Sequence, residues 1–499
     1  MINTMEHLIL LALVLPLVTG AFIMTQSGLK SIRLINLAGS SLLSLVLGVL
    51  VFQVATTGVI HYGQLYGKIY IDQLSAVMLL VVAVLNFTAA LFSLSYMEQE
   101  LEEGHASLKM LKRYYGLFNL FVFTMVCVTV AENMGMLWVA VEATTLSSAL
   151  LVAFYFDRAA LEAAWKYVMV CTVGICLALL GTILMYYAQV NVGVTDGQAL
   201  SWLALKAVSD KLDPGMIKLA FVFILIGYGT KVGLAPMHTW LPDAHSQAPS
   251  PVSGLLSGAL LSCALYAIIR TVIIVKGAVG ADFPEHFLTG FGLLSIIIAV
   301  PFILVQHDLK RLLAYSSIEH MGLITLGVGI GTPLATYGAL LHIINHAITK
   351  SALFYLAGAI IQFYGTKHIM RIKGLVSAAP AMGAMFIAVV LAIAGLPPFS
   401  IFYSKFTIVW AAFQMGNPWL GAGILLLMAA IFAGMIYYTL SMGFGSVPHR
   451  LAGEHRLGRT SLTAVSASLM IMLATGIYLP AWLDTLLTQA VAIVIGGGQ

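Results

Sequence analysis

Charged residues are scarce in this chain of 499 residues. Asp, Glu, Lys and Arg together make up 9% of it, hydrophobic residues make up 60%, and the mean hydropathy is +0.98. A soluble globular domain carries about 25% charged residues. The chain therefore lacks the polar surface that water requires, which excludes an ordinary soluble protein.

Motifs for cofactors and metals are missing as well. None of the four cysteines forms a CxxC pair, so we expect no iron–sulfur cluster, nickel–iron centre or structural zinc. They are Cys127, Cys171, Cys176 and Cys263. No GxxxxGK[ST] loop or GxGxxG turn is present, so neither ATP nor a dinucleotide is an expected ligand. A formal net charge of +4 is too small to suggest nucleic acid. We expect no cofactor in this chain.

What is present is a series of apolar runs of roughly 20 residues, the length that an α-helix needs to cross a bilayer. The runs are too continuous for the strands of a β-barrel. We therefore predict an all-α integral membrane protein with about 14 transmembrane helices. The predicted spans are 5–25, 33–56, 71–97, 113–131, 134–156, 163–188, 216–235, 250–275, 288–305, 312–330, 334–363, 380–410, 418–444 and 461–482. No basic stretch precedes the first run, which indicates a retained helix.

The basic residues between these spans are distributed unevenly. The odd-numbered breaks contain Lys30, Arg33, Lys109, Lys112, Arg113, Arg158, Lys310, Arg311, Lys367, Arg371, Lys373, Arg450, Arg456 and Arg459, and the even-numbered breaks contain Lys68, Lys206, Lys211 and Lys276. The positive-inside rule then places the odd breaks in the cytoplasm and both termini on the outer face. No break is long enough to fold into an extramembrane domain.

Two of the spans are interrupted by Gly and Pro. Gly227–Pro236 interrupts the seventh span, and Gly395–Phe399 interrupts the twelfth. Gly and Pro at membrane depth loosen the backbone hydrogen bonding, and matched interruptions in two halves are typical of a transport site. Because five helices separate the interruptions, we predict two inverted five-helix repeats with broken helices 7 and 12.

Ionisable residues lie inside these spans, although an Arg, Lys or Asp at the bilayer centre costs about 2.5–3.5 kcal/mol on insertion scales. They are Glu142, Lys231, Glu319, His320, His342, His346, Lys350 and Lys405. His342, His346 and Lys350 recur every four residues and therefore share one helix face. Three polar groups along one face cannot all reach the membrane surface, whereas Glu142 and Lys231 alone would fit a static ion pair.

Three interpretations of the His342–Lys350 face are open: a metal site, a structural polar seam and a hydrated proton relay. Histidines at i and i+4 can bind zinc, but no Cys or acidic third ligand lies nearby in the sequence. Desolvation and a neighbouring carboxylate act in opposite senses on a buried lysine, so such a lysine can change its charge. Histidine suits the links between lysines of this kind. We favour a relay through Glu142, Lys231, His346, Lys350 and Lys405.

At these residues the sequence resembles a known family. The stretch KVGLAPMHTWLPDAHSQAPSPVS, from Lys231 to Ser253, resembles the signature of the antiporter-like subunits of respiratory complex I. Mrp-type sodium/proton antiporters and group 4 membrane-bound hydrogenases belong to the same superfamily. Further matches are Trp138–Glu142, Gln306–Ser316, His342–Lys350 and Gly395–Lys405. Leu260–Tyr266 is most similar to component F of hydrogenase-4-type complexes.

The resemblance implies N-terminal helices over 1–112, inverted repeats over 113–280 and 281–445, and a C-terminal helix and tail over 446–499. It also implies a proton pathway formed by Glu142, Lys166 at the rim, Lys231, His342, His346, Lys350 and the terminal Lys405. Many members carry Lys or His in the middle of helix eight, where this chain has Ser262, so that link would need water. Candidate supporting residues are His238, Ser262, Tyr266, Glu319 and His320.

Three functions are compatible with this sequence. The first is a proton-translocating subunit of a redox-driven complex of the hydrogenase-4, formate hydrogenlyase or complex I type. Its partners would be other membrane subunits and a peripheral nickel–iron and iron–sulfur module, and any oxidoreductase activity would belong to the complex. The second is a subunit of an Mrp-type sodium/proton antiporter, and the third is a membrane subunit of an inorganic-carbon uptake complex or a non-pumping scaffold.

Two arguments rank these functions. Sodium prefers several oxygen ligands, and Glu142 has no second acid nearby in the sequence, which favours protons. Costly buried lysines argue against a pure scaffold. The resemblance implies the prokaryotic inner (cytoplasmic) membrane.

Overall fold

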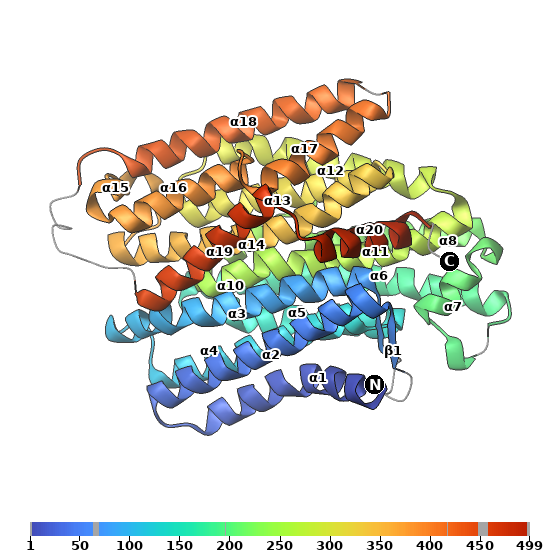
Figure 1. The fold of residues 1–499 in the computed structure, drawn as a ribbon, viewed down its shortest axis with the longest axis horizontal. Helices are drawn as coiled ribbons and strands as arrows, with labels where there is room; N and C mark the ends of the chain where they lie inside the picture. Colours follow the sequence, from blue (N-terminus) through green and yellow to red (C-terminus); the bar gives the residue numbers. More distant parts are fainter. Residues whose placement is uncertain (1, 63–68, 195, 417, 448–457, 497–499) are drawn as a thin grey trace.

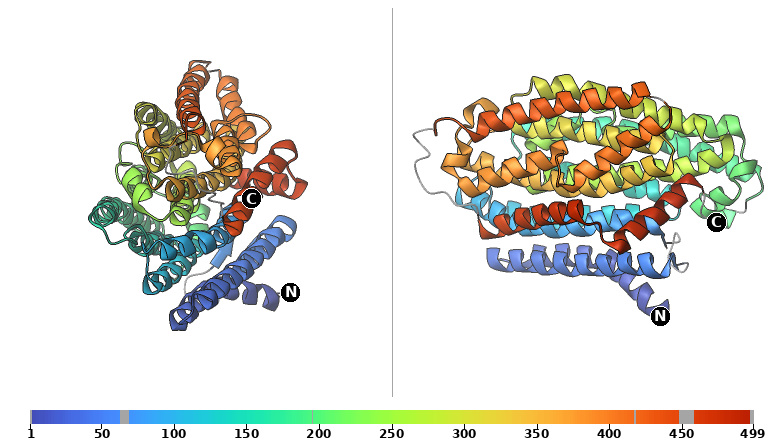
Figure 2. Two further views of the ribbon diagram at one scale, coloured as in Figure 1. Left: turned by 90° about the vertical axis from the view of Figure 1, so that its left-hand side faces the viewer. Right: turned by 45° about the horizontal axis from the view of Figure 1, so that its top comes forward.

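The computed structural model describes residues 2–62, 69–194, 196–416, 418–447 and 458–496, nearly all of them in helices. The helices run side by side along one direction (Figure 1), and Figure 2 shows the same bundle from its end. Three residues used to predict the orientation, Lys68, Arg450 and Arg456, lie outside the described residues. The predicted all-α fold is confirmed, with one small antiparallel hairpin, β1 (Ile60–Tyr62) and β2 (Ile69–Ile71), as an addition.

The bounds of the helices are as follows. The first half contains α1 (Ile2–Thr25), α2 (Leu29–Thr57), α3 (Gln73–Glu102), α4 (Leu108–Val130), α5 (Met134–Val152), α6 (Arg158–Asn191), α7 (Trp202–Ala207), α8 (Pro214–Val232), α9 (Leu241–Gln247), α10 (Ser250–Leu255) and α11 (Leu261–Val279). A π-helical turn, Leu256–Leu260, joins α10 to α11. The second half contains α12 (Asp282–Leu304), α13 (Leu309–Gly329), α14 (Pro333–Tyr364), α15 (Leu375–Ala378), α16 (Pro380–Ala394), α17 (Ser400–Gln414), α18 (Pro418–Gly443), α19 (Arg459–Ile477) and α20 (Ala481–Ile495).

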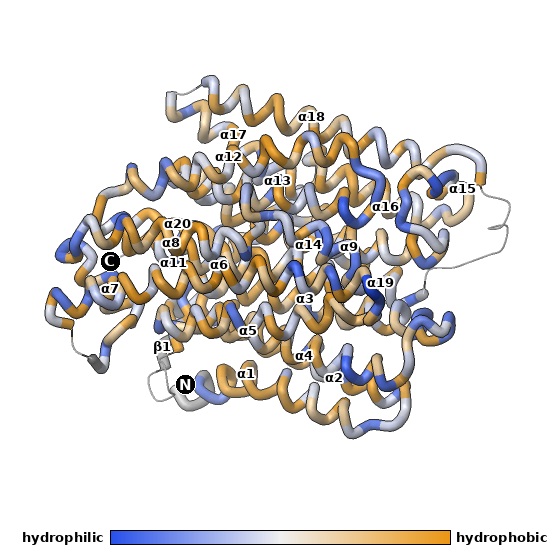
Figure 3. The backbone as a smooth tube through the Cα atoms, turned by 180° about the vertical axis from the view of Figure 1, so that it is seen from behind, coloured by the Kyte–Doolittle hydropathy of each residue, from blue (hydrophilic) through white to orange (hydrophobic). Residues whose placement is uncertain are grey.

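Twelve helices within the described residues are long and apolar enough to cross a membrane. Two predicted spans are not among the twelve. One is α13, which has 21 residues and carries three charged side chains, and the other is the pair α16 and α17, which are separate helices of 15 residues each. Adding these two segments to the twelve gives the fourteen predicted spans. Figure 3 shows these segments as largely hydrophobic, with hydrophilic residues concentrated at their ends.

Both predicted interruptions are present. The helix α8 ends at Val232, where Gly233 adopts the left-handed conformation with φ of 79°, and α9 begins only at Leu241. In the second half α16 ends at Ala394, where Gly395 adopts the left-handed conformation with φ of 90°, and α17 begins at Ser400. Glycine is the residue that adopts such a helix end without steric cost. The first break has a buried start, Gly233–Ala235, whereas the second break is partly exposed at Pro397 and Pro398.

Glycines also bring pairs of helices into backbone contact. A Cβ built on Gly227 of α8 would lie 2.6 Å from the carbonyl oxygen of Gly174 on α6. A Cβ on Gly292 of α12 would lie 2.7 Å from the carbonyl oxygen of Gly322 on α13. Small residues at such contacts are the usual basis of helix packing in membranes, where the hydrophobic effect does not drive association. The helix pairs α6–α8 and α12–α13 are therefore closely packed.

The C-terminal segment contains a helix that we did not predict. The predicted span 461–482 ends at Ile477, and α20 follows after a break of three residues and packs against α3 and α14. Both termini lie at the same end of the bundle, and α15 lies at the opposite end (Figure 1).

Candidate functional site

Lys231 is fully buried in the last turn of α8, at the first break. Its Nζ donates to the hydroxyl of Thr145 on α5 at 2.7 Å and to the hydroxyl of Tyr167 on α6 at 2.6 Å. Nζ also lies 4.7 Å from the centre of the Tyr167 ring. The last turn of a helix presents free carbonyl groups and the negative end of its dipole, which favours a cation there. Hydroxyls, a ring and a helix end thus solvate this ammonium.

Glu142 of α5 is half-buried and belongs to the same cluster. Its Oε2 accepts from the Thr145 hydroxyl at 3.2 Å, and its Oε1 accepts from the Thr172 hydroxyl at 3.4 Å. Within the part of the chain that the structure describes, no ion pair joins Glu142 to Lys231. Thr145 stands between them, since its hydroxyl accepts from the lysine and donates to the glutamate. A single hydroxyl therefore bridges the two predicted residues.

Lys350 is fully buried at the middle of α14. Its Nζ donates to the Leu313 carbonyl at 3.1 Å and to the hydroxyl of Ser316, both on α13. Its hydrogen bonds are thus made to neutral groups. A buried ammonium without a carboxylate in contact is expensive, which is typical of a residue retained for function and not for stability.

Three histidines pack together between α13 and α14. Nδ1 of His320 lies 2.9 Å from Nε2 of His342, and Nδ1 of His342 lies 2.8 Å from the hydroxyl of Ser404 on α17. The ring of His346 lies 5.2 Å from that of His320, centre to centre, and neither of its nitrogens has a hydrogen-bond partner within the described residues. The rings of His320 and His342 stack at 5.1 Å. The cluster extends from α14 to the second break.

The metal interpretation of these histidines finds no support in their arrangement. Within the described ranges, no group of three or more His, Cys, Asp or Glu side chains is placed to hold a metal ion. The nitrogens of His342 contact His320 and Ser404, and those of His346 have no partner within the described residues. The arrangement suits the passing of a proton from one ring to the next.

Lys405 of α17 forms the buried ion pair of the second break. Its Nζ lies 3.2 Å from Oε1 of Glu319 on α13, and Oε2 of the same carboxylate lies 3.3 Å from Nε2 of His320. A Cβ on Gly395 would lie 3.1 Å from Cδ of Lys405, so the glycine gives the lysine room beside the end of α16. Of the residues that the sequence suggested only as supporting ones, Glu319 thus contacts the terminal lysine directly, and His320 contacts Glu319.

A small cavity connects this pair with the surroundings of Lys350. Its volume is about 10 Å³, and its polar lining comes from Ser316, Glu319, His320 and Lys405. Roughly 10–15 Å³ is the least space that holds one water molecule. Ser316 is also the hydroxyl partner of Lys350, so one water in this cavity would join the two lysines.

The structure does not bring all predicted residues to this series. Tyr266 lies in a different buried cluster, where its hydroxyl is 3.0 Å from that of Ser75. In that cluster Arg270 makes a bidentate ion pair with Asp72, at 2.5 and 2.6 Å. His238 lies in the break after α8, where its ring faces those of Phe302 and Tyr315.

Lys166 lies outside the buried series. It is half-exposed and pairs with Glu162 at 2.7 Å and with Asp243 at 3.3 Å. Asp243 also pairs with Arg311, so this rim contact ties α6, α9 and α13 together.

The eighth predicted span, which forms α10, the π-helical turn and α11, contacts α13 through a residue that we did not single out. Ser262 donates to the carbonyl of Gly258 at 2.8 Å, within its own helix. Ser257, in the π-helical turn, has its hydroxyl 2.8 Å from that of Ser317 on α13. A pair of serines is therefore one of the buried polar contacts between the halves of the protein.

Comparison with known proteins gives the family. The family model described as "NADH:quinone oxidoreductase/Mrp antiporter, TM" matches residues 131–436, and one described as "NADH-Ubiquinone oxidoreductase (complex I), chain 5 N-terminus" matches residues 61–106. The chain belongs to the family of antiporter-like membrane subunits. The resemblance predicted from the sequence is thereby confirmed.

Relatives and solved structures fit this assignment. The chain is 39% identical over 411 residues to the hydrogenase-4 component F homolog of Methylacidiphilum infernorum, which covers 82% of this chain and 85% of that protein. It is 28% identical over 422 residues to a Na(+)/H(+) antiporter subunit of Alkalihalophilus pseudofirmus, with 83% and 82% covered. A chain of the membrane-bound sulfane sulfur reductase, an archaeal respiratory membrane complex, superposes with a TM-score of 0.85 at 25% identity, covering 98% and 97% of the two chains. Antiporter-like subunits such as these are parts of multi-subunit membrane assemblies.

The family-matched region contains every residue of the predicted pathway, from Glu142 to Lys405. Two buried groups in it escaped the sequence analysis. His245 of α9 stacks on Phe354, one turn after Lys350, at 4.9 Å between ring centres. Lys310 of α13 is buried and donates to the carbonyl of Ala248 at 2.7 Å. His245 lies within the signature stretch from Lys231 to Ser253, so its position in a family motif could have identified it as a candidate site residue.

These two groups lie beside a polar cleft at the basic end of the bundle. The cleft has a volume of about 660 Å³, and Glu100, His105, Tyr155, Ser246, Lys310 and Lys367 are among its lining residues. Ser246 directly follows His245 in α9. The cleft therefore extends from this end of the bundle to the buried Lys310 and to the residue next to His245.

Proposed function

We propose that this chain is the proton-translocating membrane subunit of a redox-driven complex of the hydrogenase-4, formate hydrogenlyase or complex I type. The observation that carries the proposal is the pair of buried lysine–carboxylate clusters at the two helix breaks. Glu142, Thr145 and Lys231 form the first cluster, and Lys405 with Glu319 forms the second. Each cluster holds an ammonium next to a carboxylate in a low-dielectric interior, where the position of a proton decides both charges.

The groups between the clusters supply the connection. Protons pass from the first cluster to Lys350 through Ser257, Ser317 and water, and from Lys350 to Lys405 through Ser316 and the water-sized cavity. The histidine cluster of α13 and α14 lies alongside this last step. Hydroxyl and imidazole groups can each accept one proton and release another, which is the property that a relay requires.

Membrane orientation follows from the basic residues. We propose the prokaryotic inner membrane, with both termini on the outer face and the polar cleft facing the cytoplasm. Lys367, Arg371 and Lys373 precede α15, which lies at the end of the bundle opposite to both termini (Figure 1). The cytoplasm would then supply protons through the cleft beside Lys310. Reaction of an impermeant label with a cysteine placed at Gly496 only from the outer side would test this orientation.

The test of function uses two lysines of one helix. Lys231 is buried near the end of α8, and Lys218 is exposed thirteen residues earlier on the same helix. In membrane vesicles, Lys231→Ala should abolish proton translocation while the complex still assembles, and Lys218→Ala should leave translocation unchanged. Normal proton translocation by the Lys231 variant would refute the proposed pathway.

A second measurement separates the redox-driven complex from an Mrp-type antiporter. The tagged chain is purified in mild detergent, and the proteins that accompany it are identified by mass spectrometry. Partners with nickel–iron or iron–sulfur motifs support the proposed complex. Small membrane subunits alone, together with sodium-dependent collapse of a pH gradient in vesicles, would replace it by the antiporter.

A further inference from the structure

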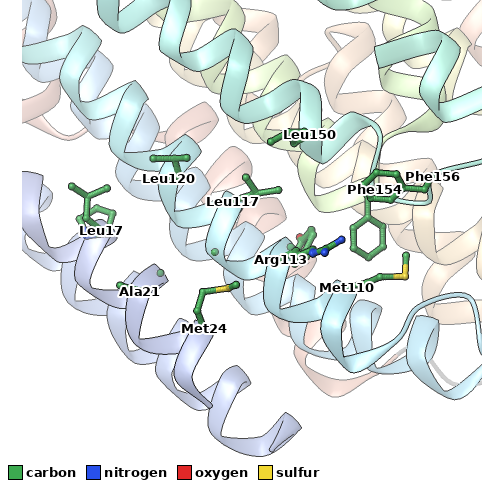
Figure 4. A pocket seen from close by; sticks show the side chains of 14 residues that line it. Leu17, Ala21, Met24, Met110, Arg113, Leu117, Leu120, Leu150, Phe154 and Phe156 are labelled. Atoms are coloured by element: carbon green, nitrogen blue, oxygen red, sulfur yellow. The ribbon is translucent and has the colours of Figure 1, made fainter. Parts of the chain in front are cut away.

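An apolar cavity lies between α1 and α4 (Figure 4). Its volume is about 510 Å³, within the range of about 300–1,000 Å³ that is usual for ligand pockets. Leu17, Ala21 and Met24 form one wall, from α1, and Leu117 and Leu120 of α4 form the other. Apart from one cation, the lining is almost entirely apolar.

Small residues create this space. Gly20 of α1 and Gly116 of α4 face each other closely, because a Cβ on Gly20 would lie 3.3 Å from the carbonyl oxygen of Gly116. Both glycines line the cavity together with Ala21. Outside this contact α1 is poorly covered, since Val18 and Phe22 are 56% and 54% exposed. The cavity is therefore a recess in a surface that faces the bilayer.

The cation in the lining is Arg113. It is exposed in the second turn of α4, five residues after the helix begins and thus about 8 Å along its axis. Within the described residues no carboxylate pairs with it, whereas Arg33, at the same end of the bundle, is held by Glu98 at 2.5 Å. Lys109 lies one turn earlier on the same face of α4 and is also exposed. The recess thus has a positively charged mouth at the level of the lipid headgroups.

The geometry points to a binding site for an anionic phospholipid, with an acyl chain in the recess and the headgroup phosphate on Arg113. A guanidinium is the side chain best matched to a phosphate, because its N–H groups bind two phosphate oxygens at once. The volume suits an acyl chain better than a transmembrane helix of a partner. A helix is about 10–12 Å wide, so 510 Å³ would hold only about one turn of it. A flexible acyl chain fits a narrow recess of this length.

Three variants test the site in the complex as purified. Arg113→Gln removes the phosphate contact, Ala21→Phe fills the recess, and Lys30→Gln removes an exposed cation of α2 as the matched control. Native mass spectrometry counts bound lipid after titration with phosphatidylglycerol or phosphatidylcholine. We expect Arg113→Gln to weaken retention of phosphatidylglycerol about fivefold, which corresponds to the roughly 1 kcal/mol that one cation contributes near an anionic surface. The effect on phosphatidylcholine should be smaller, because its choline cation leaves the headgroup without net charge. Ala21→Phe should reduce both lipids, and Lys30→Gln neither.

Two results would overturn the assignment. One is equal retention of phosphatidylglycerol by the wild type and the Arg113 and Ala21 variants, with folding verified by an unchanged melting temperature. The other comes from a photoreactive residue at Leu17 in native membranes. Crosslinking of that residue to lipid supports the site, and crosslinking to a protein subunit refutes it.

Discussion

Replacing Thr145 by Val would remove the hydroxyl that joins Glu142 to Lys231 while keeping the shape of the side chain. Lys231 would lose one of its two donated hydrogen bonds, and Glu142 would lose one of its two accepted bonds. A hydrogen bond to a charged group contributes about 1.5–3 kcal/mol. If the proton passes through this hydroxyl, the loss slows translocation by about 10- to 150-fold.

The assay compares proton uptake by inverted membrane vesicles, followed with a pH-sensitive dye and driven by the electron donor of the complex. Thr145→Ser keeps the hydroxyl and should retain most of the activity. Thr144→Val is the matched control, because the Thr144 hydroxyl donates only to the backbone of its own helix, at Val141. Electron transfer measured with an uncoupler verifies that each complex is intact. If the Thr145→Val complex takes up protons at the wild-type rate, the Thr145 hydroxyl does not carry protons between Glu142 and Lys231.

Three further changes have expected outcomes. Glu319→Gln leaves Lys405 buried without its partner, which should lower stability by about 3–5 kcal/mol and stop translocation. The double variant Glu319→Leu, Lys405→Met should regain thermal stability without regaining translocation. Recovery of both properties would contradict the proposed pathway. His346→Leu removes ring nitrogens that have no partner within the described residues, so the melting temperature should hold while proton uptake falls; a variant that pumps normally would remove His346 from the relay. Asp72→Asn weakens the ion pair with Arg270, which lies outside the pathway. It should reduce thermal stability more than it reduces the rate of proton uptake per assembled complex, whereas Thr145→Val should mainly reduce the rate of proton uptake.

The positions of the buried charges could be predicted from the sequence alone. Lys231, Lys350 and Lys405 stand out because each interrupts an apolar run that would be more stable in the membrane without it. The glycines and prolines after Lys231 and before Lys405 identified the helix breaks for a similar reason, since they disturb the hydrogen bonding of a helix. The burial of all three lysines follows these expectations, and their roles in translocation stay predictions.

The partners of these charges could not be predicted. Thr145, Tyr167 and Ser316 are ordinary hydroxyl residues, and many others are buried in this chain with bonds only to their own helix. Which hydroxyl meets a lysine depends on how α5, α6 and α13 are rotated against their neighbours. That rotation is set by packing contacts between residues far apart in the sequence.

The eighth predicted span, α10 to α11, shows a second limit of prediction from the sequence. Counting residues from the family pattern selected Ser262, but the π-helical turn over Leu256–Leu260 inserts one residue into the regular helical repeat. The faces of the helix before and after this turn are offset by about 100°, one residue of a regular helix. Ser257 therefore meets α13, whereas Ser262 bonds within its own helix. A local change of helix type of this kind leaves no clear mark in the sequence.

The hydroxyl next to each cluster has a consequence for the direction of transport. The Thr145, Ser316 and Ser404 hydroxyls each have two lone pairs and one hydrogen, so a proton can hop across any of them equally well from either side. A proton pathway made of such groups can work in both directions and has no preferred direction of its own. In the proposed pathway, the direction of transport would therefore be set by the order in which the charged clusters at its two ends are opened to water.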